Sequence, residues 1–166
     1  NHGFWKVGGM EEVFASHGIC FRDCTTVNMT GITVKNCNLH DITTWNVDGI
    51  TVNDFTLLAA DNKNWLIYQT RNGTISNSRS DDAEYEDGFM MYYGNSNLTF
   101  TNCSTSNNGR EGFGVNSTNT NITLNNCSGT DNGQNLYIGL SNNVTVNTFY
   151  STRGGVFRHN TTEYRP

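Results

Sequence analysis

The residues best suited to chemistry form an acidic run near the middle of the chain. Five carboxylates occupy residues 81–87, and Glu111 follows Asp87 by 24 residues. Several hard oxygen ligands in one place suit Ca²⁺, whereas two adjacent carboxyl groups suit cleavage of a glycosidic bond. A solvated acidic loop that binds nothing is the plain alternative. The candidate calcium ligands are Asp81, Asp82, Glu84, Asp87 and Glu111.

The sequence assigns no catalytic set around this run, so it leaves the catalytic residues unknown. The nearby arginines, Arg79 and Arg110, have no spacing that gives them a role. The histidines stand at no recognised ligand spacing, and we expect structural roles for all four: His2, His17, His40 and His159. No cofactor is required by these residues, and calcium is the one that they would suit.

A repeat must position these side chains, because six short segments of the chain follow one pattern. Most read apolar-Thr-apolar, as in Ile50-Thr51-Val52, and they recur at intervals of 18, 23, 25, 24 and 22 residues. A repeat of this length, built on one short strand, is typical of a solenoid. In each strand the apolar residues face a core and the threonine faces outward. The six threonines are Thr33, Thr51, Thr74, Thr99, Thr123 and Thr145.

A second apolar segment recurs about half a repeat away, as at residues 65–68 and 89–92, with turn-forming residues between the two segments. We therefore predict an all-β solenoid of about six coils; an antiparallel meander explains the fixed spacing less well. The 18-residue interval predicts a shortened corner, and the span from Gly73 to Asp87 predicts an enlarged loop. The predicted regions are a lead-in or cap at 1–19, the solenoid at 20–160 and a tail at 161–166.

The polar position that follows each segment is predicted to form a corner. Asn tolerates the left-handed conformation that a sharp corner needs, and stacked Asn amides hydrogen-bond along a repeat. We expect this ladder to be buried, which would keep Asn102 and Asn126 free of glycan. Its members are Asn36, Asp54, Asn77, Asn102, Asn126 and Thr148.

Nine Asn-x-Ser/Thr sequons are present, several of them generated by the repeat itself. Stacked about 5 Å apart, glycans on both Asn97 and Asn121 would crowd each other. The predicted glycosylation sites are Asn28, Asn72, Asn97, Asn121, Asn143 and Asn160.

The outward threonines form a flat polar face, for which two interpretations stay open. The face of Thr33, Thr51, Thr74, Thr99, Thr123 and Thr145 would bind a sugar chain, a neighbouring rod or, less plausibly, ice. Alternatively, Thr simply suits an exposed strand position.

Five cysteines are present and none has zinc-site spacing. Cys103 and Cys127 share one position of the repeat, where stacked strands would bring them within disulfide range. A small apolar core residue is the other interpretation of a buried cysteine.

These segments resemble the right-handed parallel β-helix proteins, the pectate-lyase-like and NosD-like group that includes alginate epimerase modules. The resemblance covers roughly residues 20–160 and rests on the Ile-Thr-Val-x-Asn-Cys segments and on Asp87-Gly88-Phe89 and Glu111-Gly112-Phe113. It implies a right-handed, single-stranded parallel β-helix. The group contains lyases, hydrolases, epimerases, tailspikes, adhesins and surface-layer proteins, so the fold does not select an activity.

Charge and composition narrow the function classes. A net charge of −5 argues against a nucleic-acid groove, and no apolar run is long enough to span a membrane. The chain starts at Asn1, which suggests a mature product or a fragment. We expect an extracellular or cell-surface structural protein that associates with itself into a fibre, sheath or lattice and contacts glycans. The alternative is a lyase, hydrolase or C5-epimerase acting on an acidic glycan, with or without calcium.

Overall fold

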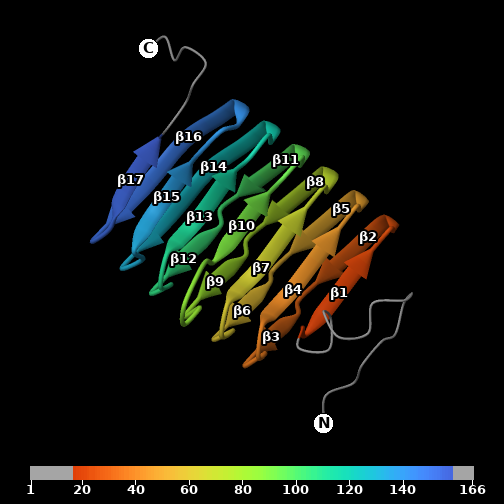
Figure 1. Ribbon diagram of the computed structural model, residues 1–166, viewed down its shortest axis with the longest axis horizontal. Helices are drawn as coiled ribbons and strands as arrows, with labels where there is room; N and C mark the ends of the chain where they lie inside the picture. Colours follow the sequence, from red (N-terminus) through yellow and green to blue (C-terminus); the bar gives the residue numbers. More distant parts are fainter. Residues whose placement is uncertain (1–16, 159–166) are drawn as a thin grey trace.

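The computed structural model describes residues 17–158 and shows a parallel β-solenoid (Figure 1). Sheet A has seven strands in the order β1-β4-β7-β10-β13-β15-β17. Sheet B has ten strands in the order β2-β5-β8-β11-β14-β12-β9-β6-β3, with β16 beside β14. Because the chain alternates between the sheets as it climbs, neighbouring strands of each sheet come from successive coils. The predicted all-β parallel solenoid is confirmed.

The strands are short, and the strands of sheet A alternate along the chain with strands of sheet B. In chain order they are β1 (Ile19–Arg22), β2 (Thr25–Thr30), β3 (Thr33–Lys35), β4 (His40–Trp45), β5 (Asp48–Asn53), β6 (Thr56–Leu58), β7 (Lys63–Tyr68), β8 (Arg71–Ser76), β9 (Arg79–Asp81), β10 (Phe89–Tyr92), β11 (Ser96–Thr101), β12 (Ser104–Ser106), β13 (Glu111–Asn116), β14 (Thr120–Thr130), β15 (Gln134–Ile138), β16 (Asn142–Thr152) and β17 (Gly155–Arg158). The tail at 161–166 and most of the lead-in at 1–19 lie outside the described residues and remain predictions.

Five of the six predicted threonines stack in one column of sheet B. The strand register places Thr51 beside Thr74, Thr74 beside Thr99, Thr99 beside Thr123 and Thr123 beside Thr145. The sixth assignment was wrong, because Thr33 lies on β3 and pairs with Thr56, while Asn28 stands beside Thr51. The proposed shortened corner does not exist. The two sheet B strands of one coil share the same apolar alternation, so a segment of the β3 type was mistaken for one of the β2 type.

Large apolar side chains fill the space between the sheets. Trp65, Phe89 and Phe113 are fully buried and stack from coil to coil, with ring centroids 6.1 Å and 5.2 Å apart. The strand register pairs Trp65 with Phe89 and Phe89 with Phe113, so the three residues occupy equivalent positions in successive coils. Burial of an aromatic side chain in three successive coils, flanked by Ile42 and Leu136, makes each coil dependent on its neighbours.

The corner column has the predicted left-handed backbone, but it is exposed rather than buried. Its φ angles are 58° at Asp54, 50° at Asn77, 53° at Asn102 and 50° at Asn126. Asn102 and Asn126 each donate their amide to the previous member, at 3.2 and 2.8 Å, and both side chains face solvent. A left-handed residue at a convex corner directs its side chain away from the core. In the first coil, Gly31 takes the place predicted for Asn36.

Two other asparagine ladders are buried inside the corners between the sheets. Asn108 donates to Asn132 at 2.8 Å, and Asn95 donates to Asn119 at 2.9 Å. Their side-chain carbonyl oxygens also accept hydrogen bonds from backbone N–H groups. Asn108 Oδ1, for example, accepts the Ala83 N–H. Buried backbone donors must be paired, and these amides pair the donors that the turns leave without strand partners.

Two further expectations concern the loop and the cysteines. The acidic segment is only one residue longer than its neighbour, because Ala59 to Lys63 matches Asp82 to Asp87 in register. The predicted enlarged loop is therefore wrong. All five cysteines are free thiols, and Cys103 and Cys127 are buried side by side in the core.

Candidate functional site

The five candidate calcium ligands do not converge. Asp87, just before β10, and Glu111, the first residue of β13, stack on adjacent coils, as their spacing indicated, and the Glu111 N–H donates to Asp87 Oδ1 at 3.1 Å. Asp81 instead accepts the Ser106 hydroxyl at 2.9 Å at the end of β9, and Asp82 and Glu84 are exposed. Within residues 17–158, no three His, Cys, Asp or Glu side chains are grouped so that they could hold a metal ion. The predicted five-ligand site is therefore not formed.

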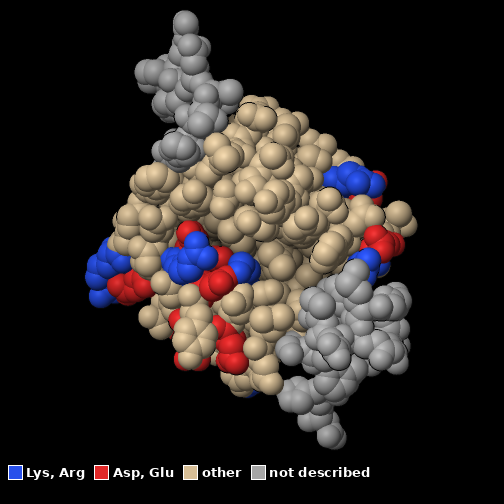
Figure 2. All heavy atoms as spheres, in the orientation of Figure 1, with Lys and Arg blue, Asp and Glu red and all other residues tan. Residues whose placement is uncertain are grey.

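Asp87 and Glu111 belong to a column of polar side chains on the outer face of sheet A, here called the polar column. The register aligns His40 with Lys63 and Glu111 with Gln134, and Asp87 lies between because Phe89 pairs with both Trp65 and Phe113. The members are His17, His40, Lys63, Asp87, Glu111 and Gln134. Figure 2 shows acidic and basic side chains gathered on this face within a mostly uncharged surface.

Glycines show which way the two carboxyl groups point. A Cβ built at Gly88 or Gly112 would meet interior atoms, including the Asn108 and Asn132 amides. A Cβ at Gly114 would instead lie 3.7 Å from the Glu111 Cβ and against Met90. Since Gly114 faces away from the core residue Phe113, Glu111 lies on the outer face of the sheet.

The pair is buried although it faces outward. Asp87 is 0% exposed and Glu111 is 7% exposed. Burial, hydrogen bonding with Glu111 and the Glu111 charge together raise the pKa of Asp87 to about 7, and the Lys63 charge opposes them. Asp87 Oδ2 lies 3.7 Å from Lys63 Nζ, so the buried carboxyl group faces both an acid and a cation.

Two cations flank the pair. Lys63 contacts the Glu86 carboxylate and places its Nζ 3.7 Å from Asp87 Oδ2. Burial lowers the pKa of Lys63. Arg110 brings a guanidinium nitrogen 3.3 Å from Glu111 Oε1, and its side chain is 53% exposed. The site therefore combines two buried, stacked carboxyl groups with one partly buried and one accessible cation.

Two histidines continue the polar column. His40 accepts the Lys63 N–H on Nδ1 at 3.2 Å, and its ring packs edge-on against His17 at 4.8 Å. Burial, followed by the charges of His17 and Lys63, lowers the pKa of His40 to about 3, so its ring is neutral near pH 7. His2 and His159 lie outside the described residues.

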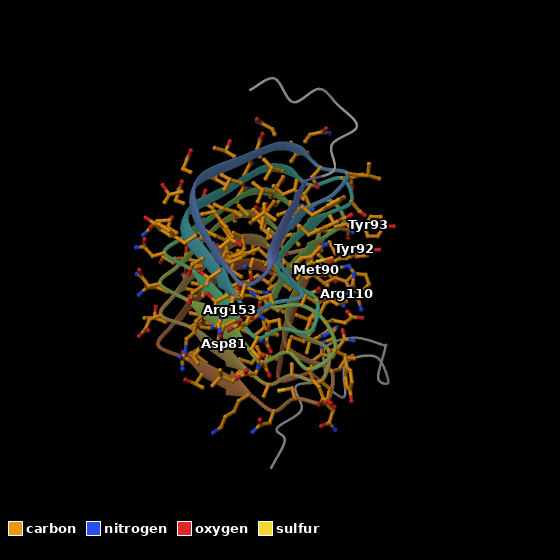
Figure 3. All side chains as sticks on the ribbon, turned by 90° about the vertical axis from the view of Figure 1, so that its left-hand side faces the viewer. Asp81, Met90, Tyr92, Tyr93, Arg110 and Arg153 are labelled. Carbon is orange, nitrogen blue, oxygen red and sulfur yellow. The ribbon has the colours of Figure 1, made fainter. Side chains whose placement is uncertain are left out.

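Aromatic side chains line the opposite margin of the same face. Trp45 packs on Tyr68 at 4.8 Å between ring centroids, Tyr68 lies 5.9 Å from Tyr93, and Tyr93 lies 4.5 Å from Tyr92. These four residues are the aromatic column. Leu66, Met90 and Gly114 separate it from the polar column. Figure 3 shows Met90, Tyr92, Tyr93 and Arg110 on one side of the solenoid.

The sequence contained a signal for this face that we did not use. The second apolar segment was predicted to be a second strand of each coil, and every other residue of such a strand faces outward. Trp45, Tyr68 and Tyr92 occupy matching outward positions of successive segments. Large aromatic residues repeated at outward positions indicate a surface that binds something.

The threonine face lies on sheet B and remains a candidate surface only. Thr51, Thr74 and Thr145 are exposed, and Thr99 and Thr123 are partly covered. Uncharged residues such as Asn125 and Asn147, joined by a 2.9 Å amide hydrogen bond, flank the column.

Four of the predicted glycosylation sites form an exposed ladder beside the threonine face. Asn97 donates its amide to Asn72 at 3.0 Å, Asn121 donates to Asn97 at 3.0 Å, and Asn143 donates to Asn121. A glycan on one of these amides would compete with the ladder. Asn28 is exposed on β2, and Asn160 lies outside the described residues. Glycosylation stays a prediction.

Comparisons with known proteins agree with the fold. A family model described as "Right handed beta helix region" matches residues 11–163. Tailspike protein 2 from Escherichia coli O157:H7 bacteriophage CAB120 superposes with a TM-score of 0.72 at 13% identity, over 89% of this chain and 22% of the tailspike. Pectate lyase Pel9A gives 0.68 at 17% identity, over 83% of this chain and 47% of the lyase. No curated protein matches the sequence.

The chain thus spans less than half the length of either structural neighbour. At these identities the likeness shows the fold alone. Residues 17–158 contain no helix with the length and apolar character needed to cross a membrane.

Proposed function

Because the chain belongs to the right-handed β-helix family, we propose that it binds a glycan on the outer face of sheet A, outside the cell or at its surface. The observation that carries the proposal is the aromatic column running parallel to the polar column on one face. Tyr92 lies five positions beyond Asp87 along the coil, which corresponds to about 16 Å. A glycan of a few units can therefore reach both columns.

The two columns suit the two kinds of surface that a sugar presents. Aromatic rings offer flat apolar area with a polar edge, against which the C–H face of a sugar packs. The exposed Arg110 and the partly buried Lys63 offer N–H donors to its hydroxyl or carboxylate groups. A pectate lyase and a phage tailspike among the structural neighbours are consistent with this use of the face.

Binding to immobilised polygalacturonate, alginate, hyaluronan and xylan tests the proposal. We expect the purified chain to bind at least one of them, and Tyr68→Ala to weaken that binding roughly fivefold, since a stacked ring contributes about 1 kcal/mol. Tyr150→Ala is the matched control, because Tyr150 is 61% exposed on β16 of sheet B. Binding to none of the four polysaccharides, or an equal loss of binding in both variants, would contradict the proposal.

Association between copies is a second candidate function, favoured by the last described coil. Within residues 17–158, β16 and β17 each pair with a strand on one side only. Val156 continues the core column of Leu136 but is 47% exposed. Open strand edges and exposed core positions favour the addition of another coil.

Sedimentation velocity over a range of concentrations tests the association. We expect species larger than a monomer to grow with concentration and to diminish in Val156→Glu, with Tyr150→Glu as the control. A monomer at every concentration would exclude a role for this edge.

A further inference from the structure

One strand of the proposed glycan surface lacks a side chain at its centre. On the outer face of sheet A, β13 presents only Gly114 between Glu111 and Asn116. In the neighbouring strands the position of Gly114 is held by large residues, Met90 on β10 and Tyr137 on β15. The missing side chain leaves a gap between the polar column and the aromatic column, here called the Gly114 gap.

The Met90 side chain fills the Gly114 gap. A Cβ built on Gly114 would overlap Met90 Sδ and would lie 3.5 Å from Met90 Cε, so the thioether folds across the Gly114 backbone. Met90 is therefore only 4% exposed, although it points away from the core, in which its neighbour Met91 is fully buried. A methionine side chain is unbranched and flexible, so it fills an irregular gap and leaves it again at low cost.

The surroundings of the gap suit a sugar ring. At its polar end, Arg110 offers guanidinium donors on a side chain that is 53% exposed. At its other end lies the ring of Tyr92, and the Tyr137 ring extends along its strand over Gly139, where a Cβ would lie 2.9 Å from the ring. Figure 3 shows Met90, Arg110 and Tyr92 on the same side of the solenoid. A ring placed over Gly114 would thus lie between hydrogen-bond donors and aromatic surface.

We propose that Met90 is the gate of the glycan site, an inference that rests on the proposed function. Its side chain occupies the Gly114 gap in the free protein and turns outward when a sugar ring enters. Because only molecules with the gap open can bind, the closed state lowers the observed affinity by the fraction that is open. The gate also covers the apolar floor of the site when no glycan is bound.

Binding to immobilised polygalacturonate, alginate, hyaluronan and xylan tests the gate. Met90→Ala empties the gap and should tighten binding about fivefold, the gain expected if the gap is filled in about four of five free molecules. Gly114→Val fills the gap permanently and should weaken binding at least about tenfold. Leu66→Ala is the matched control, because Leu66 is the equivalent outward residue one coil earlier and stands between Thr43 and Met90, with no glycine beside it. Its truncation should not tighten binding.

Oxidation by dilute hydrogen peroxide reports the position of the Met90 side chain directly. Peroxide transfers one oxygen atom to the thioether sulfur, which gives the sulfoxide and water. A bound polysaccharide should raise the oxidation rate of Met90 about fivefold, because the sulfur leaves the gap. A Met90 that merely packs under the ligand would be shielded and would react more slowly. Met91, fully buried in the core, is the internal standard in peptide mass spectrometry and should not change.

The outcomes separate the gate from the proposed function. If wild type binds a polysaccharide but Met90→Ala binds it no more tightly, or if the polysaccharide slows Met90 oxidation, the gate is overturned and glycan binding stands. Equal gains in Met90→Ala and Leu66→Ala also overturn the gate, since any truncation on this face would then have the same effect. If neither wild type nor Met90→Ala binds any of the four, glycan binding itself is overturned. Circular dichroism confirms that the variants fold, and if Gly114→Val does not, Met90→Ala and the oxidation rates decide.

Discussion

The outer faces of the two sheets follow the same coil spacing but differ in composition. On sheet B the central column is threonine in five successive coils, from Thr51 to Thr145, with uncharged neighbours. On sheet A the matching positions hold histidine, lysine, two acids and glutamine, beside an aromatic column. Stacking identical small side chains suits a regular strand surface, whereas stacking dissimilar buried charges does not.

This difference indicates where function is placed. A threonine column suits β-strand geometry, and it does not force unpaired polar side-chain atoms into the interior. The polar column instead keeps Asp87 fully buried with a raised pKa, between the Glu111 carboxyl group and the Lys63 ammonium group. A site that departs from local stability rules is the expected place for binding or catalysis.

The largest expected effect concerns the frame that both faces share. Asn108→Ala should lower the free energy of unfolding by about 3 kcal/mol, because Asn108 pairs buried groups of Ala83, Ser80 and Asn132. Asn102→Ala, in the exposed ladder, should cost about 1 kcal/mol or less. Urea denaturation measures both values. Similar losses in the two variants would mean that buried and exposed ladders contribute alike.

The next largest effect is a pH dependence of stability that comes from the outer face of sheet A. The Asp87 pKa is raised from 3.8 to about 7, so its contribution to stability is complete below about pH 4 and is lost as the pH rises through 7. Asp87→Asn removes this dependence and should be about 2 kcal/mol more stable than wild type at pH 8, with no gain at pH 4. Asp41 titrates in the same direction and His40 in the opposite one. Both are unchanged in the variant, so the difference between the two proteins reports Asp87 together with its interactions with Lys63 and Glu111.

Urea melts of wild type and Asp87→Asn at pH 4, 6 and 8 would measure this difference. A variant that is less stable than wild type at pH 8 would show that the buried carboxyl group supports the fold. The polar column would then be structural, and the contrast between the two faces would no longer indicate a functional site on sheet A.

The smallest effect belongs to sheet B. Thr99→Val should change the free energy of unfolding by less than about 0.5 kcal/mol, because the side chain lies on the outer face and both residues favour strands. It should also leave glycan binding unchanged. A loss of binding in Thr99→Val would move the proposed surface from sheet A to the threonine face.

The repeat could be recognised in the sequence wherever one residue type recurred at the same position of successive coils. The columns of Thr51 and Asn77 were predicted from the sequence, and so was the stacking of Asp87 on Glu111. Thr33 was placed on the wrong strand, because alternation alone does not distinguish one leg of a coil from another. The corner ladder was predicted but its exposure was not, since a column of equivalent residues does not reveal which way its side chains point.

The candidate site could be predicted only in part. Asp87 and Glu111 were singled out by charge and by spacing, but Lys63 and His40 share no residue type with them and therefore gave no repeat signal. The aromatic column was hidden within segments that also supply the core.

Residue types and their intervals determine that this chain winds into stacked coils, because each apolar position needs an equivalent position above and below to be buried. Only the tertiary structure decides that a histidine, a lysine and two acids from four coils share one column, because that depends on register across hydrogen-bonded strands. It also decides the protonation of Asp87, since burial and a neighbouring charge, rather than the identity of the residue, set its pKa.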